Sequence, residues 1–136
     1  MDMTADDALS LARKFREAAL AAGNFLYDNW AELDPRDRDT LRSLDITLQN
    51  VATDLVTQAV GITLDEAQTS IAKLAAATDK AKTALKKIND VKAAIGIVTA
   101  LIGFAAAIPT GNIASIVSAV NAVKDATSPA KPASPA

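Results

Sequence analysis

The sequence predicts an all-α protein, an antiparallel four-helix bundle with a long third helix leading into an apolar helical hairpin. Half of the 136 residues are hydrophobic but only 4 % are aromatic, a composition that favours closely packed helices over sheet. Apolar residues recur in steps of three and four, which is typical of helices with one buried face. We expect residues 1–126 to form a single domain and residues 127–136, rich in proline and alanine, to form a disordered tail.

The first helix is expected from about Ala5 to Leu33, with Thr4 as its N-cap. Its apolar stripe consists of Ala8, Ala12, Phe15, Ala19, Ala22, Leu26, Trp30 and Leu33. Phe25, Tyr27 and Trp30 crowd together near the end of this helix. We interpret them as an aromatic plug in the core at one end of the bundle, with a partner-binding hot spot or an interfacial belt as the alternatives.

The second helix is expected from about Pro35 to Val60, with Asp34 as the N-cap and Pro35 at its first position. Its apolar positions form a heptad seam that indicates packing against a nearly antiparallel helix. They are Leu41, Leu44, Leu48, Val51, Leu55 and Ala59.

The third helix is expected to begin at a capping box formed by Thr63 and Glu66. Its seam continues without proline as far as Ile108, which would make a helix of about 68 Å. Ordinary helices are much shorter. A break near Asn89-Asp90 or at Gly96 is therefore an alternative.

Residues 93–123 carry no charge and are bracketed by Lys92 and Lys124. The cluster Pro109-Thr110-Gly111-Asn112 is made of turn formers, so this segment predicts a hairpin whose second arm runs from about Asn112 to Ala126. Gly96, Ala100, Gly103 and Ala107 fall on one face and form a small-residue groove that permits close approach of another helix. The residues expected in membrane insertion or in an oligomer interface are Ile95, Gly96, Ile97, Val98, Ala100, Leu101, Ile102, Gly103, Phe104, Ile108, Ile113, Ile116, Val117 and Val120.

Lysines precede the hairpin. Lys73, Lys80 and Lys87 recur every seven residues, and such a stripe forms either a solvated face or a basic collar for anionic headgroups. The residues expected to contact headgroups are Lys86, Lys87, Lys92 and Lys124.

The hairpin is short for a membrane span, which needs about 20 apolar residues. The uncharged parts of its arms, residues 93–108 and 112–123, have 16 and 12 residues and reach only about 24 and 18 Å. Because both feet carry lysine, a re-entrant wedge with its feet on one side is the geometry that fits.

The composition excludes several classes of function. The chain has neither cysteine nor histidine, so we expect no enzyme, no cofactor and no metal. The acidic run Asp34, Asp37 and Asp39 lacks the spacing and the glycine of a calcium loop. The net charge is −7 over residues 1–66 and +5 over residues 67–136, and the overall acidity argues against nucleic-acid binding. Acidic residues precede basic ones at the N-terminus, unlike in a secretory signal. We therefore expect a cytoplasmic protein or one exported without a cleavable signal, with membrane association left open.

The segment Leu64 to Lys92, followed by AAIGIVTALIGFAAAIPTGNIASIV, resembles the α-helical pore-forming toxins of the cytolysin A and haemolysin BL type. The resemblance implies a hairpin that is tucked against a bundle in the soluble form and inserts on oligomerisation. This chain is much shorter than those toxins and lacks their second long helix.

Two functions are compatible with these observations. The first is a membrane-active, pore-forming or membrane-perturbing protein that acts on a lipid bilayer and assembles with copies of itself or with a helical partner. The second is a soluble interaction module, such as a chaperone, adaptor or assembly subunit, with the hairpin as its core or its oligomer interface.

Overall fold

The computed structural model describes residues 2–128, and its regular secondary structure is all helical, with no strand in that range. Its elements are α1 (Ala5–Asp28), η1 (Trp30–Glu32), α2 (Pro35–Gln58), α3 (Ile71–Lys87), α4 (Val91–Ala107), η2 (Ile108–Thr110) and α5 (Ile113–Thr127). The expected tail lies outside the described residues except for Thr127, which ends α5, and Ser128, which is its C-cap.

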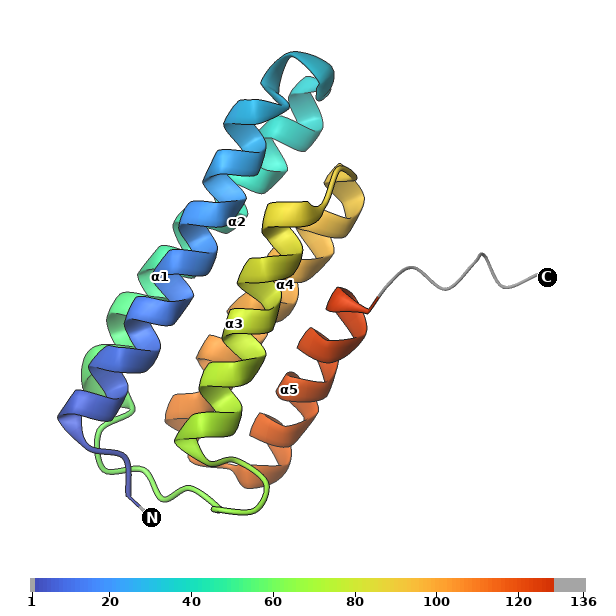
Figure 1. The fold of residues 1–136 in the computed structure, drawn as a ribbon. Coiled ribbons are helices and arrows are strands. Elements are labelled where there is room, and N and C mark those ends of the chain that lie inside the picture. Colours follow the sequence, from blue (N-terminus) through green and yellow to red (C-terminus); the bar gives the residue numbers. More distant parts are fainter. Residues whose placement is uncertain (1, 129–136) are drawn as a thin grey trace.

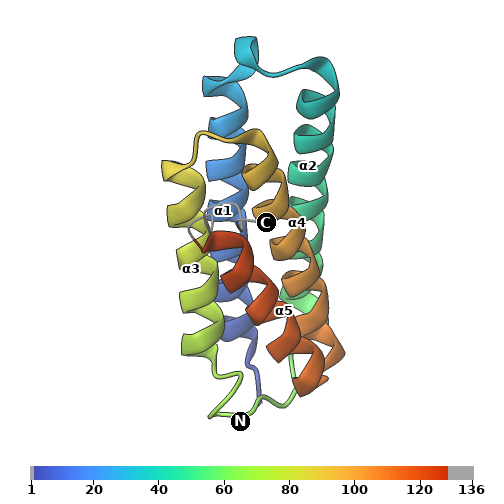
Figure 2. The same ribbon diagram turned by 90° about the vertical axis from the view of Figure 1, so that its right-hand side faces the viewer.

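Five helices pack around one core (Figure 1). Helix α1 contacts α2 on one side and α3 on the other, α2 contacts α4, and α5 contacts both α3 and α4. Figure 2 shows α5 lying in front of the gap between α3 and α4. In the core between α1 and α4, the aromatic rings of Phe15 and Phe104 meet edge to face, with their centroids 5.3 Å apart.

The predicted long third helix is wrong, because α3 and α4 are separate helices. Helix α3 ends at Lys87, Ile88 is extended, and Asp90 begins α4 by accepting a hydrogen bond from the Lys92 backbone N–H at 3.0 Å. The alternative of a break near Asn89-Asp90 is therefore confirmed. The turn lets α4 reverse direction and pack on α2, which a single long rod could not do.

The predicted capping box at Thr63 is also wrong. The Thr63 hydroxyl donates to Asp2 Oδ1 at 2.9 Å, and the Asp65 side chain accepts from the backbone of Ala67 and Gln68. These local bonds hold residues 63–70 as a loop, and α3 begins only after Ser70, whose hydroxyl caps it. A polar side chain that can fold back on nearby backbone competes with a helix start.

The caps of α1, α2 and the hairpin turn are confirmed. Thr4 and Asp7 exchange hydrogen bonds across the first turn of α1, and Asp34 caps α2 with Pro35 at its first position. In the hairpin turn Gly111 has φ +66°, and Asn112 caps α5 by accepting from Ser115 N–H. A positive φ suits glycine because it has no Cβ, so the corner falls where the turn formers predict it.

Candidate functional site

The large side chains of the hairpin α4–η2–α5 point into the bundle. Among the residues expected in insertion or in an oligomer interface, seven are buried, five are half-buried and two are exposed. The buried ones are Ile97, Val98, Leu101, Phe104, Ile108, Ile116 and Val120; the half-buried ones are Ile95, Ala100, Ile102, Ile113 and Val117; the exposed ones are Gly96 and Gly103.

The outward side of the hairpin is uncharged and made of small residues. An open groove of about 570 Å³ runs between α4 and α5. Its lining residues are Thr99, Ala100, Gly103, Ala107, Ala114, Ser115, Ser118, Ala119 and Ala122. A Cβ placed on Gly96 or on Gly103 would have no neighbour within 4 Å. Within residues 2–128, no side chain or helix therefore packs closely on Gly103, and the small-residue groove that permits close approach of another helix is open.

The lysines expected at headgroups are all exposed. Lys86 and Lys87 lie in the last turn of α3 and Lys92 in the first turn of α4, so they gather at the α3–α4 turn. Lys124 lies in the last turn of α5. The two feet of the hairpin are therefore both remote from its Pro109–Gly111 corner (Figure 1).

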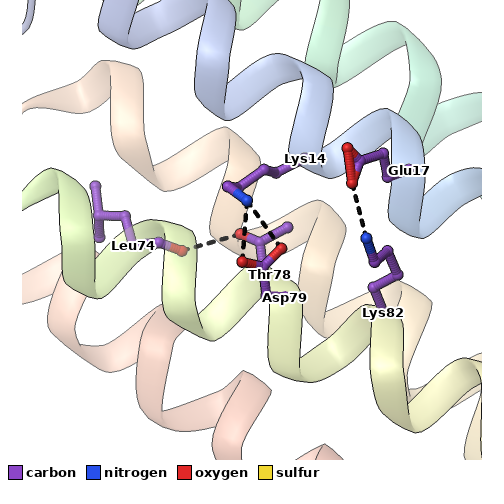
Figure 3. Close-up of polar contacts among 6 residues, drawn as sticks. All are labelled: Lys14, Glu17, Leu74, Thr78, Asp79 and Lys82. Carbon is purple, nitrogen blue, oxygen red and sulfur yellow. Dashed lines mark hydrogen bonds and ion pairs between the residues drawn. The ribbon is translucent and has the colours of Figure 1, made fainter.

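The side of α3 that faces α1 carries balanced charges (Figure 3). Lys14 binds Asp79 at 2.9 Å and Lys82 binds Glu17 at 2.8 Å. The bond from Lys82 holds the pKa of Glu17 below its ordinary value, and the same bond raises the pKa of Lys82. These side chains are still partly exposed to solvent, between 25 % and 48 %, so the pairs fix the register of α1 on α3 more than they stabilise the fold.

The side of α3 that faces α5 carries only positive charge. Here a groove of about 370 Å³ lies between α3, α5 and the loop before α3, and its charged lining residues are Lys73, Lys80 and Lys124. The Lys73 ammonium donates to the backbone carbonyl of Ala67. Among residues 2–128, neither the Lys80 ammonium nor the Lys124 ammonium has a hydrogen bond or an ion pair.

The connected ends of α1 and α2 project beyond the α3–α4 turn (Figures 1 and 2). Here a groove of about 400 Å³ is lined by Gly23, Leu26, Tyr27, Trp30, Arg42, Asp45 and Ile46, which we call the tip surface. Tyr27 is 79 % exposed, Trp30 40 % and Ile46 54 %. Of the three aromatic residues expected in a core plug, only Phe25 is buried. That expectation is wrong for Tyr27 and Trp30, because no third helix reaches this end of α1 and α2.

Two arginines behave differently at the tip. The guanidinium of Arg38 lies 4.8 Å from the centroid of the Trp30 ring, and its Nε donates to the Trp30 carbonyl at 2.8 Å. These contacts fix the indole in place. Arg42 lines the tip surface and forms no hydrogen bond or ion pair within the described residues.

Asp45 is the one polar side chain in residues 2–128 that has a buried oxygen without a partner. Its Oδ1 is shielded from solvent and accepts no hydrogen bond. Burial raises the pKa of Asp45 above its ordinary value, while the nearby Gln49 side chain opposes the shift. Gly23 lies opposite this carboxylate on the facing helix, where a Cβ would make an ordinary van der Waals contact of 3.5 Å with Asp45 Oδ2.

The sequence contained a signal for Asp45 that the heptad reading missed. The buried positions of α2 are Leu41, Leu48, Ala52 and Leu55. Leu41 and Leu48 are seven positions apart, and the turn between them places two half-buried residues, Leu44 and Asp45, on the inward side of the helix. Burying a carboxylate on the inward side of a helix lowers stability unless another group pairs with it. Asp45 is therefore a candidate binding residue.

Three further findings bear on function. No group of three acidic, histidine or cysteine side chains that could hold a metal ion occurs among residues 2–128. The stretch Val91–Thr110 is long and apolar enough to cross a membrane, with a mean hydropathy of 2.1, and 39 % of it is buried. Comparison of the chain with family models, curated proteins and solved structures finds no match.

Proposed function

We propose that this protein is a helical interaction module that assembles with a second copy of itself through the tip surface, while the hairpin serves as part of its core. The observation that carries the proposal is an exposed aromatic groove that holds both an unpaired arginine and a carboxylate oxygen without a partner. The chain thus presents both halves of an ion pair that it does not form internally.

The composition of the tip surface supports a protein partner. Residues that dominate binding energy at protein interfaces are enriched in tryptophan, tyrosine and arginine, and Tyr27, Trp30 and Arg42 lie together here. Trp30 is already held by Arg38, so little side-chain entropy would be lost when a partner covers it.

The charges of the tip surface support a second copy as that partner. In a twofold interface residue i of one copy meets residue j of the other, and j meets i. Arg42 of each copy would then donate to Asp45 of the other. This contact would give the Asp45 carboxylate an ionic partner, which it lacks within residues 2–128; the shielded Oδ1 would have to turn outward to share in it.

Charge reversal tests this pairing. Arg42→Asp and Asp45→Lys should each be monomeric where the wild type is dimeric, in analytical ultracentrifugation over a range of concentrations. An equimolar mixture of the two variants should form a heterodimer, because one copy then supplies two acids and the other two bases. Arg36→Asp, at an exposed arginine outside the groove, is the matched control and should still dimerise.

The proposal fails if the wild type stays monomeric up to about 1 mM, a concentration at which even a weak interface of about 4 kcal/mol is half-occupied. It also fails if Arg42→Asp dimerises like the wild type. Circular dichroism of each variant separates loss of association from loss of folding.

A membrane-active role is the second candidate function. It is favoured by the apolar stretch Val91–Thr110, of which less than half is buried, and by the lysines at both feet of the hairpin. The likeness to hairpin-inserting toxins adds to this candidate. Against it, the large side chains of the hairpin already have a protein environment, and leaving it would expose the facing surfaces of α1 and α2.

Labelling of the hairpin distinguishes the two candidates. Because the chain has no cysteine, an environment-sensitive fluorophore can be attached to Gly103→Cys, where the outward face has room. Insertion predicts a blue shift with anionic liposomes, together with dye leakage and flotation. Thr57→Cys on the exposed side of α2 is the control and should not shift. Absence of all three signals removes the membrane-active candidate and leaves the dimerisation test unaffected.

A further inference from the structure

The groove between α3 and α5 is a second feature that the proposed function does not use. We propose that it binds a single-chain anionic amphiphile, with the acyl chain on its apolar floor and the acidic head between Lys80 and Lys124. This site is separate from the tip surface and does not depend on dimerisation.

The floor of the groove is apolar and belongs to two helices. Ala77 of α3 and Val120 and Val123 of α5 are buried, and Val117 is half-buried beside them. A volume of about 370 Å³ lies in the range of small-molecule sites, about 300–1,000 Å³. An entire helix is about 10 Å wide, so the groove fits one hydrocarbon chain better than a helical peptide.

The rim of the groove has a single sign of charge. Lys73, Lys80 and Lys124 line it, and no aspartate or glutamate does. The other side of α3 differs, because Asp79 and Lys82 there both form ion pairs with residues of α1 (Figure 3). Uncompensated lysines beside an apolar floor are complementary to a ligand that is negative at one end and apolar at the other.

The three lysines differ in the contacts that their ammonium groups make. Lys73 is engaged with the carbonyl of Ala67, so it holds the loop before α3 against the groove. Lys80 and Lys124 are exposed and without partners in the described part of the chain. They are therefore free to bind the head, whether it is a carboxylate or a phosphate.

Titration calorimetry below the micelle-forming concentration tests the site. Dodecanoate and dodecyl phosphate should both bind, and dodecyltrimethylammonium, which has the same chain and the opposite charge, should not. Affinity should rise about fourfold for each methylene from octanoate to dodecanoate, the fold-change expected from about 0.8 kcal/mol per buried CH₂. The ratio between the carboxylate and the phosphate identifies the preferred head. Inorganic phosphate alone should bind far more weakly than dodecyl phosphate.

Variants locate the binding. Lys80→Gln and Lys124→Gln should each lower the affinity for dodecanoate about fivefold, as expected for one exposed charge contact, and Lys87→Gln on the same helix should not. Ala76→Glu places an acid in the groove at an exposed position and should abolish binding. Ala72→Glu, also exposed on α3 but outside the groove, is its matched control.

Three results would overturn the proposal. One is equal binding of the anionic and cationic amphiphiles, which would indicate adsorption to any apolar surface. Another is unchanged affinity in Lys80→Gln, Lys124→Gln and Ala76→Glu. The third is binding of an acidic amphipathic peptide but of none of the amphiphiles, which would assign the groove to a protein partner.

Discussion

The hairpin α4–η2–α5 is more apolar in sequence than the tip of α1–α2, but the tip exposes more of its large apolar side chains. The hairpin is the most apolar stretch of the chain, yet its large side chains are buried or half-buried, and small residues line its outward groove. The tip follows a helix rich in charge, yet Tyr27, Trp30 and Ile46 are exposed there. The apolarity of a segment therefore does not show where apolar surface is exposed, because exposure depends on how many neighbours the fold supplies.

The comparison matters for both candidate functions. If the exposed apolar groups decide what the molecule binds, then the tip is the binding surface of this form and the hairpin is its support. Membrane insertion would reverse these roles, since α4 and α5 would have to leave α2 and α3. Variants in each region test whether the hairpin belongs to the core and the tip to the surface.

The largest effect is expected in the hairpin. Phe104→Ala should lower the free energy of unfolding by about 3–5 kcal/mol, because Phe104 is fully buried against Phe15. Urea unfolding followed by circular dichroism measures it, with Ala106→Ser at an exposed position of the same helix as control. A loss below about 1 kcal/mol would mean that the hairpin is not part of the core in solution.

An intermediate, pH-dependent effect is expected at the tip. The pKa of Asp45 is raised in the folded protein by burial, so the folded state binds this proton more tightly than the unfolded chain does. The stabilisation from protonation is complete below the ordinary pKa of the unfolded chain and is lost as pH rises through the folded pKa. At neutral pH the buried carboxylate is therefore destabilising, and Asp45→Asn should raise stability by about 1 kcal/mol.

Urea unfolding from pH 3 to pH 7, at concentrations where copies are dissociated, measures the difference between Asp45→Asn and the wild type. The difference should shrink towards zero at the acid end of the range. A difference that is constant with pH would show that the charge of Asp45 is not its cause.

A smaller effect of opposite sign is expected on the outward face of the hairpin. Gly103→Leu should raise stability by about 0.5 kcal/mol, since a helical glycine costs about 0.5–1 kcal/mol and nothing occupies the space its side chain would enter. Thermal unfolding of this variant beside Gly103→Ala measures it. A loss above about 1 kcal/mol would reveal a helix that closes on this face in solution, as in an assembled form.

The smallest effect on folding is expected at Tyr27. Tyr27→Ser should change the free energy of unfolding by less than about 0.5 kcal/mol, as exposed substitutions do, because the side chain is 79 % exposed. The same variant should weaken dimerisation. Measuring both in one preparation by urea unfolding and sedimentation separates the two roles. A large loss of stability without any change in association would show that Tyr27 packs in the core in solution and does not contribute to an interface.

Local patterns account for the parts of the fold that local chemistry decides. The caps Thr4 and Asp34 and the corner at Gly111 follow from side chains that bond backbone within three residues, or from a φ that only glycine adopts freely. The capping box at Thr63 fails for an equally local reason, since Asp65 offers the backbone another set of bonds. A partner far away in the chain, Asp2, also draws the Thr63 hydroxyl away.

The candidate sites were harder to predict than the elements. The lysine stripe is visible in the sequence, but nothing in it says that Lys73 and Lys80 face α5 while Asp79 and Lys82 face α1. Asp45 lies next to Leu44 beside the apolar seam of α2, so its position could have been found, but its missing partner could not. Both sites depend on which helices become neighbours.

The sequence by itself determined that the chain is helical, where most helices begin, and that an uncharged hairpin turns at Pro109–Gly111. Periodicity and capping are properties of a few adjacent residues, so they can be read without the fold. Only the tertiary structure decided that the third helix is two, that the hairpin turns its large side chains inward, and that α1 and α2 extend past their neighbours. These outcomes depend on contacts between segments far apart in the chain, and the burial of each side chain is the sum of those contacts.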